Sequence, residues 1–220
     1  MLKDYSVVFD MDGVLFDTQR IYIETWLKVA EIMHIDDMDK VAVACAGLNR
    51  ADQKVYLYDY YGKEFRYEEF FDLKNKIFEE RLEKGIPLKK GTREILEYLK
   101  EQKVPVAIAS SSRVCSVKDH LEKTGLTGYF DKIVGGDTVV HSKPDPELYL
   151  LACRELGVTP SQTFAVEDSY NGLRSALSAG MMTVMVPDMM KPTDEFDRKI
   201  YGRFDSLLSF MEHLKSFEDI

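Results

Sequence analysis

Five short apolar runs recur along the chain, and most of them are followed by a segment with helical spacing of apolar residues. The runs are nearly continuous rather than alternating, which is typical of strands buried on both faces of a parallel sheet. Repeated alternation of such strands with helices predicts an α/β fold with a doubly wound parallel sheet. The strands are expected at residues 6–9, 105–109, 132–134, 163–166 and 182–186.

Residues 16–87 interrupt this alternation. They contain three patterns of helical periodicity and no convincing strand, and glycine and proline residues suited to turns flank them. We therefore expect a core of residues 1–15 and 88–220 that carries an inserted, all-helical cap domain of residues 16–87. The cap helices are predicted from the apolar positions Tyr22, Trp26, Ala30 and Met33, then Val55, Leu57, Tyr58 and Tyr61, then Phe70, Leu73, Ile77 and Leu82.

The charge balance argues against several classes of partner. The chain has 29 Lys and Arg residues against 38 Asp and Glu, a formal net charge of −9, which repels nucleic acid and anionic membrane surfaces. Its apolar stretches fall short of the roughly 20 residues that a membrane span needs. The first apolar run ends at Asp10, too early for a signal peptide. We expect a cytoplasmic protein with a small-molecule substrate and no obligate protein partner.

The cysteines Cys45, Cys115 and Cys153 are widely spaced and have apolar neighbours. Their odd number and their spacing predict neither a disulfide framework nor a zinc site. We expect all of them to be thiols in the core.

Polar residues follow the ends of several predicted strands. Asp10 and Asp12 follow the first, Ser110 follows the second, and Glu167 and Asp168 follow the fourth. Ligands of open α/β sheets bind at the carboxyl ends of the strands, so these side chains are expected to gather there. Carboxylates so close together repel one another unless a cation compensates, and oxygen ligands of this kind suit Mg²⁺.

Each polar residue also has a purely structural interpretation when it is taken alone. Serines at strand-to-helix turns, such as Ser112 and Ser169, are usually helix N-caps, and a lysine beside prolines, such as Lys143, is usually solvated. Their convergence at one edge of the sheet favours instead a site in which Ser110 and Lys143 serve an anionic phosphoryl group.

Four segments, in order along the chain, resemble the motifs of the haloacid dehalogenase superfamily. They are FDMDGVLFDT at residues 9–18, the strand end at Ser110, SKPDPE at residues 142–147 and VEDSYNG at residues 166–172. The inserted helical segment resembles the cap of the branch that contains β-phosphoglucomutase and small phosphosugar phosphatases. The resemblance implies a Rossmann-like catalytic core and Mg²⁺-dependent phosphoryl transfer.

The resemblance also implies a role for each acidic residue. Asp10 would be the nucleophile that forms an aspartyl phosphate, and Asp12 would be the general acid and base. Mg²⁺ would be held by the carboxylates of Asp10 and Asp168, by the main-chain carbonyl of Asp12, and by Glu167 directly or through water.

The remaining implied roles concern substrate phosphate. By the same resemblance, Ser110, Ser111 and Lys143 would bind the phosphoryl oxygens. In the cap, Arg50 would bind phosphate, and Lys76 would support it.

A phosphatase and a phosphomutase share this machinery, and the cap separates them. A mutase holds a bisphosphate and excludes water, so it needs a second cationic site in the cap. Arg50 matches the phosphate-binding arginine of the mutase cap, but Tyr22 and Ala46 stand where β-phosphoglucomutase carries a histidine and a lysine. We therefore favour a phosphatase that acts on a small phosphorylated metabolite such as a sugar phosphate. A phosphosugar mutase of the β-phosphoglucomutase type is the alternative.

Two further classes also combine acidic residues with phosphate. A phosphorylation-switched signalling module would place similar residues on a doubly wound sheet, but a long helical insertion argues against it. A non-catalytic phosphosugar-binding protein would be expected to lack Asp10 or Asp12, and both are present. Dehalogenase activity is disfavoured by the resemblance, because those enzymes lack the second acidic residue that Asp12 supplies.

Overall fold

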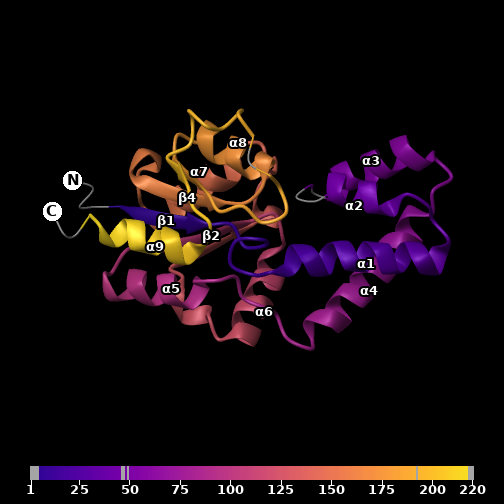
Figure 1. Cartoon of the computed structure of the whole chain (residues 1–220), viewed down its shortest axis with the longest axis horizontal. Helices are drawn as coiled ribbons and strands as arrows, with labels where there is room; N and C mark the ends of the chain where they lie inside the picture. The colour runs from indigo at the N-terminus through magenta and orange to yellow at the C-terminus, as the bar shows by residue number, and fades with distance from the viewer. Residues whose placement is uncertain (1–4, 46–47, 49, 192, 218–220) are drawn as a thin grey trace. The chain divides into compact units, whose positions relative to one another are not determined.

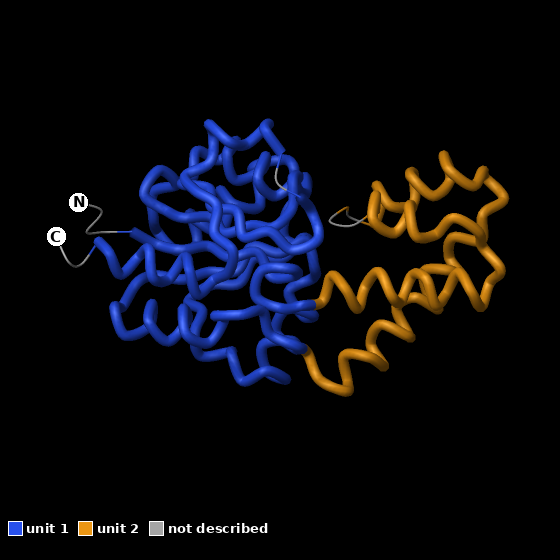
Figure 2. The backbone as a smooth tube through the Cα atoms, viewed as in Figure 1, with its two compact units in different colours: residues 1–17, 87–220 blue, residues 18–86 orange. Residues whose placement is uncertain are grey.

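The computed structural model describes residues 5–45, 48, 50–191 and 193–217. The chain divides into two compact units. Residues 1–17 and 87–220 form one unit, and residues 18–86 form the other (Figure 2). The first is an α/β unit, and the described residues of the second are helices and their connections (Figure 1).

A parallel sheet forms the centre of the α/β unit. Its strands are β1 (Ser6–Phe9), β2 (Val106–Ser110), β3 (Lys132–Gly135), β4 (Thr163–Glu167), β5 (Met182–Met185) and β6 (Gly202–Arg203). Within the described residues they lie in the order β3-β2-β1-β4-β5-β6, and every pairing is parallel. The strand β1 lies in the middle of the sheet, β2 and β3 extend it on one side, and β4, β5 and β6 extend it on the other. This is the doubly wound arrangement. The predicted fold class is confirmed.

The strands form where the continuous apolar runs predict them. Every residue of β1, β2 and β4 is buried, as expected for central strands covered on both faces. The short strand β6, which pairs with β5 through Val184 and Gly202, was not predicted. It is two residues long and has no apolar run, so the sequence carries no periodic signal for it.

Helices cover both faces of the sheet. They are α5 (Thr92–Glu101), α6 (Val114–Thr124), α7 (Glu147–Leu156), α8 (Tyr170–Ser178) and α9 (Leu207–Lys215). In Figure 1, α7 and α8 lie on one side of the strands, and α5, α6 and α9 lie on the other. The buried faces of these helices carry the apolar positions that the helical spacing predicts, such as Ile95, Leu96 and Leu99 on α5.

The helical unit has a core of its own. Its described helices are α1 (Thr18–Met33), α2 (Met38–Cys45), α3 (Arg50–Tyr61) and α4 (Tyr67–Leu82). Trp26 of α1 packs against Phe70 of α4 with ring centroids 5.1 Å apart. The sequence predicted α1, α3 and α4 but not α2. The helix α2 has only eight residues, too few to show a clear period.

The cysteine prediction is correct for two of the residues and wrong for the third. Cys45 and Cys153 are buried, whereas Cys115 is exposed. Cys115 is the second residue of α6, and the side of this helix that is buried carries Val117, His120 and Leu121 instead. Apolar neighbours in the sequence therefore did not predict burial, because the position of Cys115 on the helix puts it outside the buried face.

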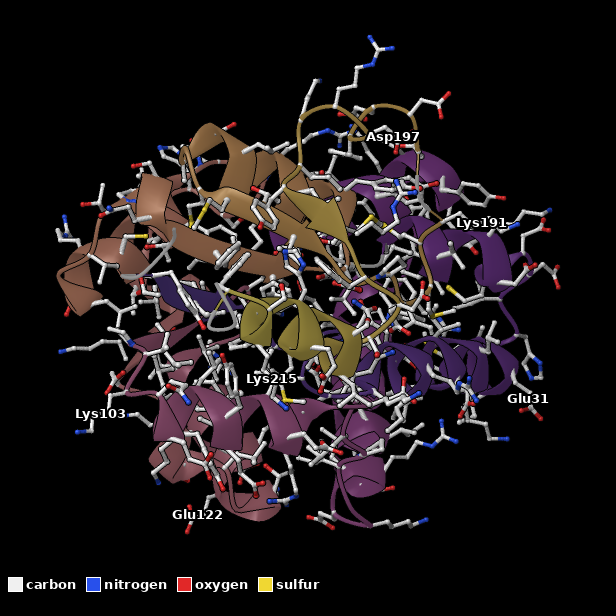
Figure 3. All side chains as sticks on the ribbon, turned by 60° about the vertical axis from the view of Figure 1, so that its left-hand side comes forward. Glu31, Lys103, Glu122, Lys191, Asp197 and Lys215 are labelled. Atoms are coloured by element: carbon white, nitrogen blue, oxygen red, sulfur yellow. The ribbon has the colours of Figure 1, made fainter. Side chains whose placement is uncertain are left out.

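Charged side chains such as Glu31, Lys103 and Glu122 are exposed and project outward from the ribbon (Figure 3). None of the helices that the structure describes combines the length and the apolar character that crossing a membrane requires.

Candidate active site

Three acidic residues meet at the carboxyl edge of the sheet. Asp10 follows β1, and its main-chain N–H donates to the carbonyl of Val166 on β4 at 3.0 Å. This pairing places Asp10 beside Glu167, the last residue of β4, and Asp168, which follows it. One carboxylate oxygen from each of Asp10, Glu167 and Asp168 lies within 4.8 Å of the other two, and all three residues are buried. The register of neighbouring strands thus brings together residues that are far apart in the sequence.

Lys143 lies among these carboxylates. It is only 5% exposed. Its Nζ donates to Asp10 Oδ1 at 2.5 Å, to Glu167 Oε1 at 2.6 Å and to the carbonyl oxygen of Ala109 at 3.1 Å. The interpretation of Lys143 as a solvated loop residue is therefore wrong. The loop before α7 directs its side chain into the sheet edge.

The electrostatics of this cluster favour an additional cation. Burial raises the pKa of Asp10 despite the opposing charge of Lys143, and Glu167 raises it further. Burial, followed by the charges of Glu167 and Asp10, raises the pKa of Asp168 well above its ordinary value. Burial alone would lower the pKa of Lys143, but Asp10 and Glu167 raise it, so this side chain stays charged. A divalent cation would offset the remaining negative charge, and three carboxylates offer the hard oxygen ligands that Mg²⁺ prefers.

Glu167 is the most enclosed member of the cluster, with no solvent exposure. The hydroxyl of Tyr149 on α7 donates to Glu167 Oε1 at 2.7 Å. Ser169 donates to Oε2 from its main-chain N–H at 3.3 Å and from its hydroxyl at 3.1 Å. A Cβ at Gly172 would lie 1.9 Å from the carboxylate, so this position of α8 must be glycine for Glu167 to occupy its place.

Sequence reasoning missed Tyr149. The residue lies in the first turn of α7 and is fully buried. Burial raises its pKa well above the ordinary value, which keeps the hydroxyl protonated and able to donate. In the sequence it looks like one more apolar position of an amphipathic helix, and no pattern there indicates a polar partner.

The serines near the site behave differently from one another. Ser169 is the N-cap of α8, where its hydroxyl accepts from the N–H of Gly172, as its position predicted. Ser112 is not the N-cap of α6; its hydroxyl donates to Asp12 Oδ2 at 3.3 Å. The hydroxyl of the buried Ser110 accepts from the N–H of Ser112 at 3.1 Å, while Ser111 is exposed. Asp12 and Ser110 therefore share Ser112 as a neighbour.

Of the two cap residues expected to bind phosphate, Arg50 already has partners and Lys76 is exposed. Arg50, at the start of α3, pairs with Glu68 at 3.0 Å, and its guanidinium lies 3.9 Å from the centroid of the Phe71 ring. Ala46, which entered the comparison with the mutase cap, lies outside the described residues.

Lys74 is a buried cation that the sequence reasoning did not identify. It is 7% exposed, and its Nζ lies 4.3 Å from the centroid of the Phe71 ring and 5.3 Å from that of Tyr22. Burial lowers the pKa of Lys74 to about 8. A signal was available, because Lys74 follows Phe70 by one helical turn and so shares its buried face.

The doubly wound sheet, with a lysine among carboxylates at its carboxyl edge, has its polar cluster at the position where α/β enzymes bind their ligands. The family model for haloacid dehalogenase-like hydrolases matches residues 7–186, well over half of the chain. The phosphorylated carbohydrates phosphatase of Thermotoga maritima is 34% identical over 189 residues, covering 80% of this chain and 82% of that protein. The β-phosphoglucomutase of Bacillus subtilis is 30% identical over 188 residues, covering 82% of each.

Solved structures agree on the fold. The crystal structure of a β-phosphoglucomutase from Clostridium difficile superposes with a TM-score of 0.82 at 22% identity, covering 98% of this chain and 97% of that one. The chain belongs to the haloacid dehalogenase-like hydrolase family, in its β-phosphoglucomutase-like branch. It is an enzyme of the phosphatase type, with phosphomutase as the alternative.

Proposed function

We propose that this protein is a Mg²⁺-dependent phosphatase that hydrolyses a small sugar phosphate through an aspartyl-phosphate intermediate. The observation that carries the proposal is the buried cluster of Asp10, Glu167, Asp168 and Lys143 at the carboxyl edge of the sheet. It lies within the residues that match a hydrolase family.

The donor set fits Mg²⁺, which Asp10, Asp168, Glu167 and the main-chain carbonyl of Asp12 would hold. When bound, the ion would neutralise the clustered carboxylates and the charge that develops on the transferring phosphoryl group. Lys143, whose Nζ contacts Asp10, would contribute a second, fixed positive charge.

The chain's own residues would carry two successive displacements at phosphorus. A carboxylate oxygen of Asp10 attacks phosphorus while Asp12 protonates the departing alkoxide oxygen, which leaves as an alcohol. Asp12 then takes a proton from a water molecule that attacks the phosphorus of the aspartyl phosphate. The P–O bond to Asp10 breaks, and inorganic phosphate and the free Asp10 carboxylate result. The contact from Ser112 would orient Asp12 for both proton transfers.

The sugar-phosphate class is supported by the relatives, one named a phosphatase of phosphorylated carbohydrates and one a β-phosphoglucomutase. One observation in the helical unit favours hydrolysis over the mutase reaction. Glu68 pairs with Arg50 and also with Lys54 at 2.7 Å. Its carboxylate therefore offsets part of the positive charge that this unit would offer to a second phosphate.

The test is a set of hexose, pentose and hexitol monophosphates incubated with the enzyme and Mg²⁺, with inorganic phosphate as the readout. We expect stoichiometric release of phosphate and free sugar, and loss of release in excess chelator. A parallel incubation of β-glucose 1-phosphate with a priming bisphosphate tests the mutase alternative. Rapid bisphosphate-dependent formation of glucose 6-phosphate with little free phosphate would overturn the hydrolase proposal.

A further inference from the structure

The three protons of the Lys143 ammonium group are all in use. A lysine has three donors and no acceptor, and Nζ of Lys143 donates to Asp10, Glu167 and the carbonyl oxygen of Ala109. A phosphoryl oxygen can therefore accept a hydrogen bond from Lys143 only if one of these three acceptors loses its hydrogen bond to Nζ. The strength of the bonds that hold Lys143 thus contributes to the affinity for phosphate.

Of the three acceptors of Lys143, Glu167 Oε1 also accepts a hydrogen bond from a neutral side chain, that of Tyr149. It accepts from Lys143 at 2.6 Å and from the hydroxyl of Tyr149 at 2.7 Å. The Lys143 ammonium also lies 5.0 Å from the centroid of the Tyr149 ring. Tyr149 consequently touches both members of the Lys143–Glu167 ion pair.

The Glu167 carboxylate has little freedom to compensate for a lost donor. Its other oxygen, Oε2, is held by Ser169, and any side chain at Gly172 would occupy the same space. Glu167 has no exposure to solvent, so water does not readily replace a missing partner. A buried carboxylate oxygen that loses a donor carries the desolvation cost of that loss.

We propose that Tyr149 is a positioning residue: its hydroxyl keeps Glu167 Oε1 hydrogen-bonded while Lys143 turns one N–H from Glu167 to a phosphoryl oxygen. The inference rests on the proposed phosphatase function, since it names a further residue of that site. Of the two donors that the described residues give to Oε1, only Lys143 remains when the hydroxyl is absent. Lys143 is then bound more firmly to Glu167, and turning one of its N–H groups from Glu167 to a phosphoryl oxygen costs more free energy.

The experiment compares Tyr149→Phe with the wild-type enzyme in saturating Mg²⁺. Titration calorimetry with inorganic phosphate gives the dissociation constant without turnover, and p-nitrophenyl phosphate gives kcat and KM. We expect phosphate to bind about tenfold more weakly, the size of one hydrogen bond to a charged group. KM should rise by a similar factor, and kcat should change less.

Tyr98→Phe is the matched control, because Tyr98 is a buried tyrosine of the same unit on α5. It should leave phosphate affinity unchanged. Unchanged phosphate affinity in Tyr149→Phe, or equal weakening in both variants, would overturn the proposal. Melting temperatures of both variants reveal whether a loss of affinity merely follows a loss of stability.

A second replacement separates the hydroxyl's role from packing. Incorporation of 4-aminophenylalanine in place of Tyr149 restores an N–H donor at the same point of the ring, so phosphate affinity should recover toward wild type. Failure to recover in a folded protein would contradict the proposal. Phosphate binding is measured without turnover, so a wild-type protein that binds phosphate but hydrolyses no ester would refute the proposed function and leave this inference testable.

Discussion

Lys143 is the cation on which the buried carboxylates of the α/β unit depend. Its ammonium group contacts Asp10 and Glu167 directly, and its charge also acts on Asp168. A buried ion pair is a poor source of net stability, but a broken one is costly because it leaves a buried charge without a partner. The side chain therefore links the stability of the fold to the chemistry of the site.

Lys143→Ala should lower both stability and activity. We expect the free energy of unfolding near neutral pH to fall by about 3–5 kcal/mol, the range for removing one partner of a buried ion pair. The loss should be larger above about pH 8, where Asp10 is deprotonated and the missing lysine leaves its charge without a partner. Urea denaturation measures it, with the exposed Lys118→Ala as control. Equal stability of Lys143→Ala and Lys118→Ala would contradict the arrangement described.

Asp10→Asn should abolish turnover and leave the fold intact. The amide oxygen can still accept from Lys143, but the amide is not a nucleophile, so kcat should fall by about 10⁴-fold or more. Phosphate release and circular dichroism measure the two effects. Asp119→Asn, an exposed aspartate on α6, serves as the control. Retention of more than a trace of activity in Asp10→Asn would show that another group attacks phosphorus.

Among the elements, α8 shows how a buried side chain of the sheet determines which residue a helix can carry against it. Its first turn is capped by Ser169 and contains Gly172, which faces the Glu167 carboxylate. Glycine costs a helix roughly 1 kcal/mol relative to alanine. Glycine at position 172 therefore makes α8 less stable but leaves space for the buried Glu167 carboxylate.

Gly172→Ala should destabilise the protein although alanine is the better helix former. A Cβ would lie 1.9 Å from the Glu167 carboxylate, so that carboxylate or the helix must move. We expect a lower melting temperature and reduced activity. Ser178→Ala, at an exposed position of the same helix, should leave both nearly unchanged or raise stability slightly. A melting temperature of Gly172→Ala at or above wild type would contradict the geometry.

The elements also show what the sequence can and cannot predict. The central strands were predictable because burial on both faces makes them continuously apolar, and the meeting of Asp10 with Glu167 and Asp168 follows from strand ends in one register. The burial of Lys74 was predictable, because Lys74 follows Phe70 by one helical turn, whereas the hydrogen bond of Tyr149 was not. Glu167, the partner of Tyr149, is brought to it by tertiary packing, which spacing along the chain does not encode.

At the scale of the whole molecule, the acidic cluster makes stability depend on pH. Asp10 has a pKa raised to about 8, and that of Asp168 is also raised. An acid with a higher pKa in the folded state binds more protons folded than unfolded, so stability is lost as pH rises above the unfolded value of about 3.9. The loss should extend from about pH 4 to about pH 8 in the metal-free protein.

Mg²⁺ should counteract this loss, and more strongly at higher pH. A metal ion binds the deprotonated carboxylates, so its affinity rises as they lose protons. At a concentration of 100 times its dissociation constant a ligand stabilises by about 2.7 kcal/mol, which corresponds to a rise in melting temperature of roughly 5–10 °C for a chain of this size. Thermal scans with Mg²⁺ or with chelator at about pH 5 and about pH 8 measure the effect. A Mg²⁺ shift that is equal at the two pH values would argue against metal binding at these acids.

The two connections to the helical unit leave the α/β unit side by side. The main-chain N–H of Asp17 donates to the carbonyl of Pro87 at 2.9 Å, and that of Lys89 donates to the carbonyl of Leu15 at 2.9 Å. Asp10, Lys143, Glu167 and Asp168 all belong to the α/β unit. The helical unit is thus an insertion whose two connecting segments are hydrogen-bonded to each other. It could be replaced by another helical domain without interrupting a strand of the sheet. Such a chimera should retain hydrolysis of simple aryl phosphates while acquiring new substrate preferences, so reactivity and selectivity can evolve as separate modules.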